Sequence, residues 1–309
     1  MTLALEKPVN RVIGRIDGRS EGPLVIFCAG IHGNEPAGLI AIRNVFEFLE
    51  KHSVNLNGTV IGLAGNLEGL TKGQRFIHRD LNRLWKLEQV KHVQAMPEEH
   101  LQAEFRDLRE LTDQIDLYRA IPHSGFLFMD LHTTSAKGGV FSFSNKVNSA
   151  FDHAKEIGVP VISNITERLK GTSVNYFEEL NLPAIGFEAG QNEEPSAIDR
   201  ATGAIIGTLV SMGVVTKDSV EELWHNVEEL RAFGEPLPKV IDLCYRHPVR
   251  INDGFRMQQG YGNFEAVKKD QVLAEDNSGA IRAVEDGYLL MPLYQSQGTD
   301  GFFIVKEVG

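Results

Sequence analysis

The chain has 309 residues, 42% of them hydrophobic and 24% charged, which is typical of a water-soluble globular protein. Its net charge of −11 argues against a nucleic acid as partner. No apolar stretch is long enough to span a membrane, and Glu6, Lys7 and Pro8 interrupt the N-terminus where a signal peptide needs an apolar core. We therefore expect a cytoplasmic protein with no membrane partner.

Strand-like and helix-like patterns alternate over the first two-thirds of the chain. The expected strands cover residues 11–19, 24–31, 59–64, 125–131, 140–143, 159–163 and 184–189. Helices are expected over 36–51 and 97–121, and further helices are expected to start at Ser196 and Asp218, each with an oxygen-bearing cap and an acid three residues later. This alternation predicts an α/β fold in which helices flank a mixed, largely parallel sheet.

The pattern changes after Gly234. Pro236 and Pro238 lie in a short segment typical of a linker, and short apolar runs separated by turn sequences such as Asn-Asp-Gly follow it. This is the pattern of a small all-β domain. We predict a catalytic domain over residues 1–234 and a C-terminal β-domain over 235–309.

Polar side chains follow three of the expected strands. His32 and Glu35 come directly after the strand 24–31, Asp130 and His132 close the run GFLFMDL, and Glu188 follows the run 184–187. Because the carboxyl ends of parallel strands form the ligand crevice of an open α/β sheet, we expect these side chains to converge.

Two histidines and one glutamate are a known ligand set for catalytic zinc, with a fourth position left for water. His32 and Glu35 are three residues apart, and Gly33 lets the backbone bend between them. His132 is the natural third ligand, because one short loop cannot direct three bonds. Glu188, in the apolar context FEAG, fits the carboxylate that takes the proton of the attacking water.

Each of these signals has an ordinary structural alternative. His-x-x-Glu is common by chance, Asp130 can serve as a cap, His132 can bond to backbone, and Glu188 can belong to a salt bridge. The segment 71–86 carries five basic residues and a single acid, Asp80. On composition alone, a solvated helix face explains this segment better than an anion-binding wall.

Four motifs in order resemble the aspartoacylase and succinylglutamate desuccinylase family. They are GIHGNE (30–35), RFIHRDLNR (75–83), DLHTT (130–134) and GFEAG (186–190). The resemblance spans roughly residues 20 to 195 and implies a fold similar to that of the zinc carboxypeptidases.

The resemblance also implies roles for individual residues. It places one zinc ion per chain on His32, Glu35 and His132, and makes Glu188 the general base and then acid. In the basic segment it implies that Arg75 polarises the scissile carbonyl, that Asn82 and Arg83 hold the substrate's carboxylate, and that Asp80 orients a ligand histidine. The solvated reading then remains for Lys72, Arg79 and Lys86.

Two departures from aspartoacylase argue against N-acetylaspartate as the substrate. Residues 175–184 contain Glu178 and Glu179 but none of the arginine that aspartoacylase carries before its catalytic glutamate. In addition, the sequence Gly301-Phe302-Phe303 stands where that enzyme has a substrate-facing tyrosine.

The sequence therefore predicts a zinc-dependent hydrolase that cleaves the amide bond of an N-acylated, carboxylate-bearing small molecule. A metallocarboxypeptidase acting on short peptides and a non-catalytic metal-binding member of the family are the alternatives. The prediction leaves the oligomeric state open and is compatible with a homo-oligomer.

Overall fold

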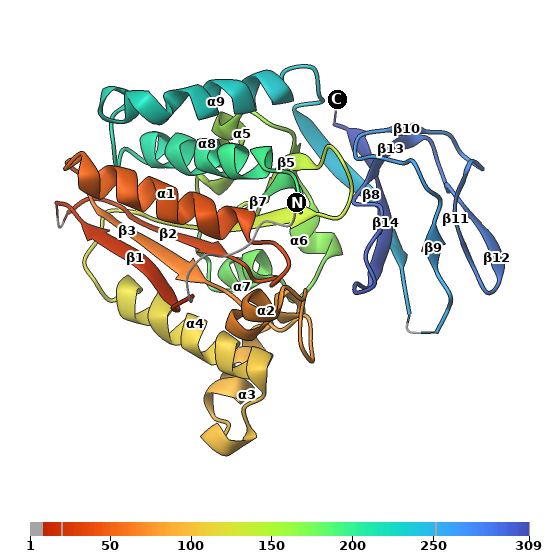
Figure 1. The fold of residues 1–309 in the computed structure, drawn as a ribbon, viewed down its shortest axis with the longest axis horizontal. Coiled ribbons are helices and arrows are strands. Elements are labelled where there is room, and N and C mark those ends of the chain that lie inside the picture. Colours follow the sequence, from red (N-terminus) through yellow and green to blue (C-terminus); the bar gives the residue numbers. More distant parts are fainter. Residues whose placement is uncertain (1–8, 20, 251, 309) are drawn as a thin grey trace.

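The structure is a computed structural model that describes residues 9–19, 21–250 and 252–308. The N-terminal segment with Glu6, Lys7 and Pro8 lies outside the described residues. Figure 1 shows a twisted sheet with helices on its two faces, and a group of C-terminal strands beyond one end of it. No helix of the described residues is both long enough and apolar enough to cross a bilayer.

The strands of the larger sheet are β1 (Val12–Asp17), β2 (Leu24–Ala29), β3 (Thr59–Ala64), β4 (Phe126–Thr134), β5 (Val140–Ser144), β6 (Val161–Ile162), β7 (Ala184–Gln191), β8 (Val240–Pro248), β10 (Ala266–Val267), β13 (Gly287–Leu290) and β14 (Asp300–Glu307). A smaller sheet contains β9 (Arg256–Met257), β11 (Val272–Asp276) and β12 (Gly279–Arg282).

The helices are α1 (Ala37–Lys51), α2 (Leu67–Lys72), α3 (Leu87–Gln94), α4 (Ala103–Arg119), α5 (Ala150–Ile157), α6 (Ile165–Arg168), α7 (Ser173–Glu179), α8 (Ser196–Ser211) and α9 (Glu221–Gly234). Three short 3₁₀ helices accompany them: η1 (Leu81–Arg83), η2 (Glu98–His100) and η3 (Lys217–Val220).

Among the described residues, eleven strands follow one another in the order β1-β3-β2-β4-β7-β5-β6-β8-β14-β13-β10. The central strands β3, β2, β4 and β7 are mutually parallel. Antiparallel pairs join β1 to β3, β5 to β7, and β14 to both β8 and β13. The prediction of a mixed α/β sheet flanked by helices is therefore confirmed.

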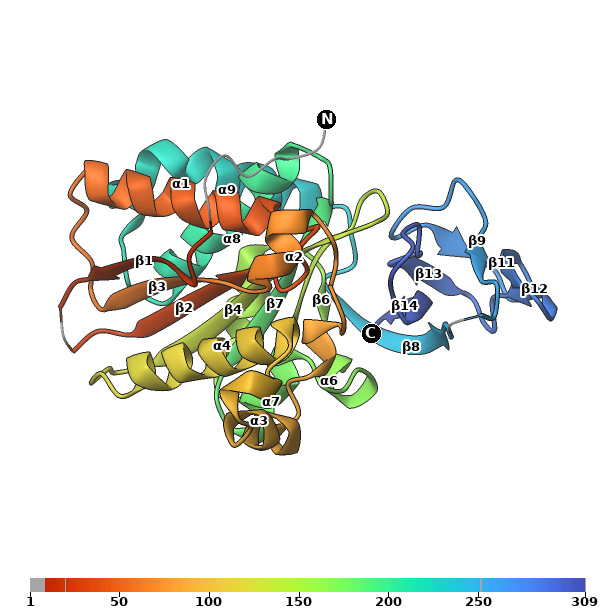
Figure 2. The same cartoon turned by 60° about the horizontal axis from the view of Figure 1, so that its bottom comes forward.

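The central strands are buried on both faces, which explains their continuous apolar sequences. Along β2, Val25 and Phe27 belong to the core beneath α1, α5, α8 and α9, while Ile26 and Cys28 belong to the core beneath α3, α4 and α7. Figure 2 shows these two helical layers on opposite sides of the sheet. Cys28 is fully buried, and burial raises the pKa of its thiol well above the ordinary value, as expected for an unreactive cysteine.

The expected helix over 97–121 is wrong in its first turn. The chain forms η2, passes through an extended Leu101, and begins α4 only at Ala103. Leu101 is buried in the core, so side-chain packing breaks the helix at this point.

Both expected caps are also wrong. No side chain caps α8 or α9; Pro195 already has helical backbone angles, and Ser196 Oγ bonds Glu194 at 2.8 Å instead.

The C-terminal strands continue the central sheet. β8 pairs in parallel with β6, and β14 pairs antiparallel with β8. A separate apolar cluster with Leu273, Phe302 and Ile304 lies between these strands and the smaller sheet. The division into domains at residue 234 stays a prediction, since the sheet itself runs across that boundary.

Phe177 tests the core that fastens β4 to α7. Its ring stacks on that of Phe128 with centroids 4.2 Å apart, and both side chains are fully buried. We expect Phe177→Ala to lower the free energy of unfolding by about 3–5 kcal/mol, because it removes buried surface and leaves a cavity. Urea unfolding followed by circular dichroism measures the loss. Leu117→Ala, at a position 60% exposed on α4, is the control, with an expected change within about 0.5 kcal/mol; equal losses would contradict this packing.

Candidate active site

His32 and Glu35 lie in the tight turn between β2 and α1. The amide of Glu35 donates to the carbonyl oxygen of His32 at 3.1 Å, which closes the turn. Gly33 allows the turn to pack against the next segment: a Cβ at this position would lie 2.0 Å from the carbonyl carbon of Gly69. The Gly33 amide also donates to the carbonyl oxygen of Arg75 at 3.1 Å, so the backbone joins the ligand turn to the basic segment.

His132 and Glu188 come from neighbouring parallel strands. They are register partners in the β4–β7 pair, which sets them at the same height in the sheet. The expected strand ends are corrected here, because β4 continues to Thr134 and β7 to Gln191. Both residues therefore lie within the carboxyl-terminal part of a strand. Glu188 has register partners on both sides, His132 on β4 and Phe141 on β5, whereas the register partner of His132 is Glu188 on β7.

The structure brings His32, Glu35 and His132 together as a buried group that could hold a metal ion, with their potential ligand atoms within 4.8 Å of one another. Nδ1 of His32 lies 2.9 Å from one oxygen of Glu35, and Nδ1 of His132 lies 3.0 Å from the other. Nδ1 of His32 is buried without a hydrogen-bond partner.

The outer nitrogens of the two rings face carboxylates. Nε2 of His32 lies 3.1 Å from Asp80, and Nε2 of His132 lies 2.9 Å from Asp130. A proton on each Nε2 leaves both Nδ1 atoms as acceptors directed at Glu35, itself an acceptor. Acceptors repel at this distance unless they share a cation, so the donor set fits a bound metal.

Charges around Glu35 are strongly coupled. Burial acts to raise the pKa of Glu35, but His32 and His132 hold it well below its ordinary value. The pKa of His132 is raised well above its ordinary value, because Asp130 and Glu35 outweigh the opposite effect of burial. These surroundings favour a positive charge between the two rings.

The guanidinium of Arg75 places a positive charge beside Glu35 and Asp80. It bonds Glu35 at 3.0 Å and Asp80 at 3.4 Å, while its Nε is buried without a partner. The solvated reading of the basic segment is thus wrong for Arg75. It is confirmed for Lys72, Arg79 and Lys86, which are exposed.

Glu188 is a buried carboxylate with an unsatisfied oxygen. It is 7% exposed, and its Oε2 is buried without a hydrogen bond. Burial raises its pKa to about 8 against the opposing charge of His132. A carboxyl group of this kind exchanges a proton readily near neutral pH.

Asn82 and Arg83 follow Asp80 in η1 and line the same cavity. Oδ1 of Asn82 accepts from the Ser173 amide at 3.1 Å, which fixes the orientation of this side chain. Nη2 of Arg83 lies 2.5 Å from Oδ2 of Asp300, at the start of β14. Arg83 is therefore already paired with a carboxylate of the protein.

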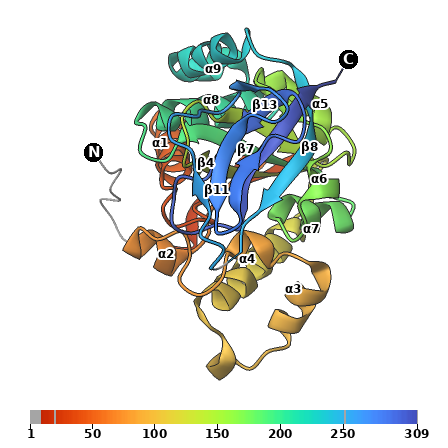
Figure 3. The same ribbon diagram turned by 90° about the vertical axis from the view of Figure 1, so that its right-hand side faces the viewer.

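The cavity around these groups has a volume of about 100 Å³. Its walls include Thr133 to Ser135 of β4 and its following turn, Phe143, Ile165, Leu169 and Thr172, and from the C-terminal region Met291, Leu293, Gln295, Gly298 to Asp300 and Phe303. Figure 3, viewed from the C-terminal side, shows the C-terminal strands, among them β8 and β13, in front of the central sheet. The C-terminal strands thus supply one wall of the site.

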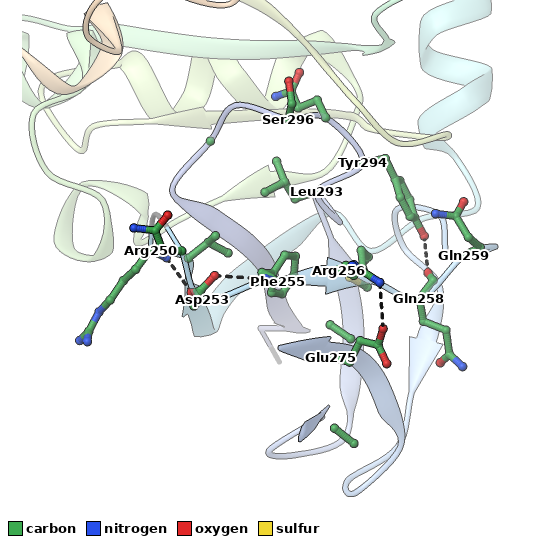
Figure 4. Close-up of a pocket in the computed structure, with 18 of the residues that line it drawn as sticks. Arg250, Asp253, Phe255, Arg256, Gln258, Gln259, Glu275, Leu293, Tyr294 and Ser296 are labelled. Atoms are coloured by element: carbon green, nitrogen blue, oxygen red, sulfur yellow. Dashed lines mark hydrogen bonds and ion pairs between the residues drawn. The ribbon is translucent and has the colours of Figure 1, made fainter. Parts of the chain in front are cut away.

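A second cavity of about 860 Å³ lies within the C-terminal region (Figure 4). Leu293, Gln295 and Gly298 line both cavities, so the segment that carries them separates the two. The labelled carboxylates of the second cavity are engaged locally: Asp253 accepts from backbone amides, and Glu275 lies 4.0 Å from Arg256. None of the predicted site residues lines it.

Comparisons with known proteins agree with this geometry. A family model described as the succinylglutamate desuccinylase/aspartoacylase catalytic domain matches residues 21–204. The chain belongs to this family. The resemblance drawn from the four motifs is thereby confirmed, and with it a function of the N-acyl amino acid deacylase type.

Relatives of known sequence and structure are distant. The succinylglutamate desuccinylase of Pseudomonas syringae pv. tomato is 23% identical over 282 residues, which cover 87% of this chain and 77% of that protein. A succinylglutamate desuccinylase/aspartoacylase structure from Rhodobacter sphaeroides has a TM-score of 0.65 at 15% identity, covering 96% of this chain and 88% of that one. A Vibrio cholerae succinylglutamate desuccinylase structure has a TM-score of 0.61 at 17% identity, with coverages of 94% and 82%. At these identities the structures support the fold alone.

Sequence reasoning placed Asp130 at the site but did not pair it with His132, and it missed Glu104 and Asp300. Asp130 lies two positions before His132, and the period of a strand places both on one face, which was the available signal. Glu104 of α4 is 1% exposed and accepts the backbone amides of Ile77 and His78, so it holds the segment between Arg75 and Asp80. Asp300 gave no signal, because its partner is 217 positions away.

Asp130→Asn tests the support of the metal group. Asn keeps the size of the side chain but removes the charge that fixes the His132 ring, so we expect zinc affinity to fall about 10–100-fold. Competition with a chromogenic chelator measures the affinity. Asp152→Asn, at an exposed position on α5, is the control and is expected to bind zinc as the wild type does. Unchanged affinity in Asp130→Asn would rule out this role.

Proposed function

We propose that this chain is a zinc-dependent hydrolase that cleaves the amide bond of an N-acylated, carboxylate-bearing small molecule. The observation that carries the proposal is the convergence of His32, Glu35, His132 and Glu188 on one small buried cavity. Membership of the family supports the same reaction type.

His32, Glu35 and His132 would hold one zinc ion per chain, as two histidines and a glutamate do in other catalytic zinc sites. When bound, zinc lowers the pKa of water and polarises a carbonyl oxygen, so that water becomes a nucleophile near neutral pH. Asp80 and Asp130 keep the two rings in the tautomer that presents Nδ1.

Glu188 handles the protons of the reaction. Its unbonded Oε2 accepts a proton as the oxygen of water forms a bond to the acyl carbon, and the same proton passes to the amine nitrogen as the carbon–nitrogen bond breaks. The products are a carboxylate and a free amine. The raised pKa of Glu188 suits both halves of this transfer.

Arg75 and η1 position the substrate. Nε of Arg75 has no partner within the described residues and can donate to the developing oxyanion. Arg83 has further N–H groups beyond the one that bonds Asp300, and the Asn82 amide adds donors for a substrate carboxylate. The volume of about 100 Å³ favours a small N-acyl compound over a peptide.

Glu188→Gln separates the chemistry from metal binding. We expect zinc content to stay near one ion per chain and kcat to fall at least about 100-fold, since the amide cannot take up a proton. The assay is a panel of N-acetyl, N-succinyl and N-formyl amino acids and short peptides, with chelator controls. Glu193→Gln, at an exposed position after β7, is the matched control and is expected to keep wild-type turnover. Turnover by Glu188→Gln at the wild-type rate would overturn the mechanism, and a zinc-loaded wild type without activity on the panel would favour a non-catalytic protein.

Arg75→Met tests stabilisation of the oxyanion. Because it removes a donor for charge that develops in the transition state, we expect kcat to fall about 10²–10³-fold with a smaller change in KM. Steady-state kinetics on the best substrate of the panel measures both. An effect confined to KM would assign Arg75 to binding instead.

A further inference from the structure

Two further charged residues among the described ones line the cavity besides the metal group, Glu188 and Arg75. They are Arg83 and Asp300. Their side chains are 26% and 13% exposed, so the pair faces the cavity while being largely removed from bulk water. The pair therefore contributes charges that a substrate in the cavity would meet beyond the metal group.

Both oxygens of Asp300 are engaged by arginines. Oδ2 meets Arg83, and Oδ1 accepts from Nε of Arg246 on β8. A carboxylate offers about four lone-pair sites, so Asp300 can accept at least one further hydrogen bond. Arg83 keeps free N–H groups in the same way, because Nη1 donates to the Asn82 carbonyl and Nη2 to Asp300. A positive and a negative binding group thus lie side by side.

Among the described residues that line the cavity, the cationic side chains besides the histidines are Arg75 and Arg83, and the remaining N–H groups of Arg83 are taken up by the first substrate carboxylate. Arg75 is bonded to Glu35 and Asp80, and Arg83 is bonded to Asp300. A dicarboxylic amine portion would place its second carboxylate against the remaining lone pairs of Asp300, where an acceptor finds no donor in a largely desolvated site. An ammonium group in the same place would donate to those lone pairs.

We infer that Asp300 determines specificity: the site selects N-acyl amino acids whose amine portion carries an ammonium group, held by Asp300, beside the carboxylate held by Arg83. This inference rests on the proposed deacylase function. It differs from a purely structural role of Asp300, which would affect all substrates equally.

The test uses the zinc-loaded full chain and three substrates of similar length. Nα-acetylornithine, Nα-acetylglutamine and Nα-acetylglutamate end in a positive, a neutral and a negative group. We expect kcat/KM to decrease in that order, with at least a tenfold difference between the first and the last. A preference for the glutamate compound, or equal rates for all three, would overturn the inference.

Asp300→Asn keeps the size of the side chain and removes its charge. We expect it to reduce the ornithine-to-glutamate ratio at least tenfold, whereas Asp300→Glu keeps the order. Asp286→Asn is the control, because Asp286 pairs with Lys268 on the exposed side of the C-terminal region. If Asp300→Asn does not fold, Asp300→Ser removes the same charge. An unchanged ratio in the charge-removing variant would assign Asp300 a structural role.

Calorimetric binding of the free products ornithine and glutamate distinguishes failure of the inference from failure of the proposed function. Ornithine is expected to bind at least tenfold more tightly, and Asp300→Asn to abolish the difference. Selective binding without hydrolysis of any substrate would overturn the deacylase proposal and leave the selection by charge standing. Hydrolysis without selection by charge would support the deacylase proposal and overturn the role inferred for Asp300.

Discussion

The carboxylate of Glu35 is the group on which the rest of the site depends. It is 2% exposed and has an imidazole nitrogen within 3.0 Å of each oxygen, so its charge is removed from water. A buried charge is tolerated only where it is paired and hydrogen-bonded. Arg75 and the amide of Thr133 supply two such bonds, and a cation between the imidazoles would complete the set. Every element that carries one of these partners must therefore meet at Glu35.

The parallel register of β2, β4 and β7 makes this meeting possible. Ala29 at the end of β2 lies opposite Leu131, and His132 lies opposite Glu188. The turn with Glu35, the ring of His132 and the carboxyl of Glu188 are thus set at one level of the sheet. A shift of one residue would turn His132 to the other face, so the hydrophobic pattern of these strands also fixes the chemistry.

Much of this arrangement could be read from the sequence, because it depends on local patterns. Continuous apolar runs placed β2, β3, β4 and β7, and polar residues near their ends marked the site. The boundaries failed where packing decided them, as at Leu101, which interrupts the expected helix because its side chain is buried. Contacts between side chains and backbone groups far apart in the sequence could not be predicted, because they leave no local sequence pattern. Glu104 accepts a hydrogen bond from the backbone amide of Ile77, and no sequence motif around either residue predicts this bond.

The contact between Arg83 and Asp300 shows why the C-terminal region cannot be treated as a cover added to a finished site. β8 extends the central sheet through its pairing with β6, and β14 adds to β8, which brings Asp300 into the lining of the cavity. There the Asp300 carboxylate is bonded by Arg246 from the neighbouring strand β8 and by Arg83 from η1. Because a partly buried ion pair loses its stabilisation when either partner is removed, the same contact fastens the wall of the cavity and fixes its charge. The attachment of the C-terminal wall to the site and the selection of the substrate by charge therefore depend on one interaction, the ion pair of Arg83 and Asp300.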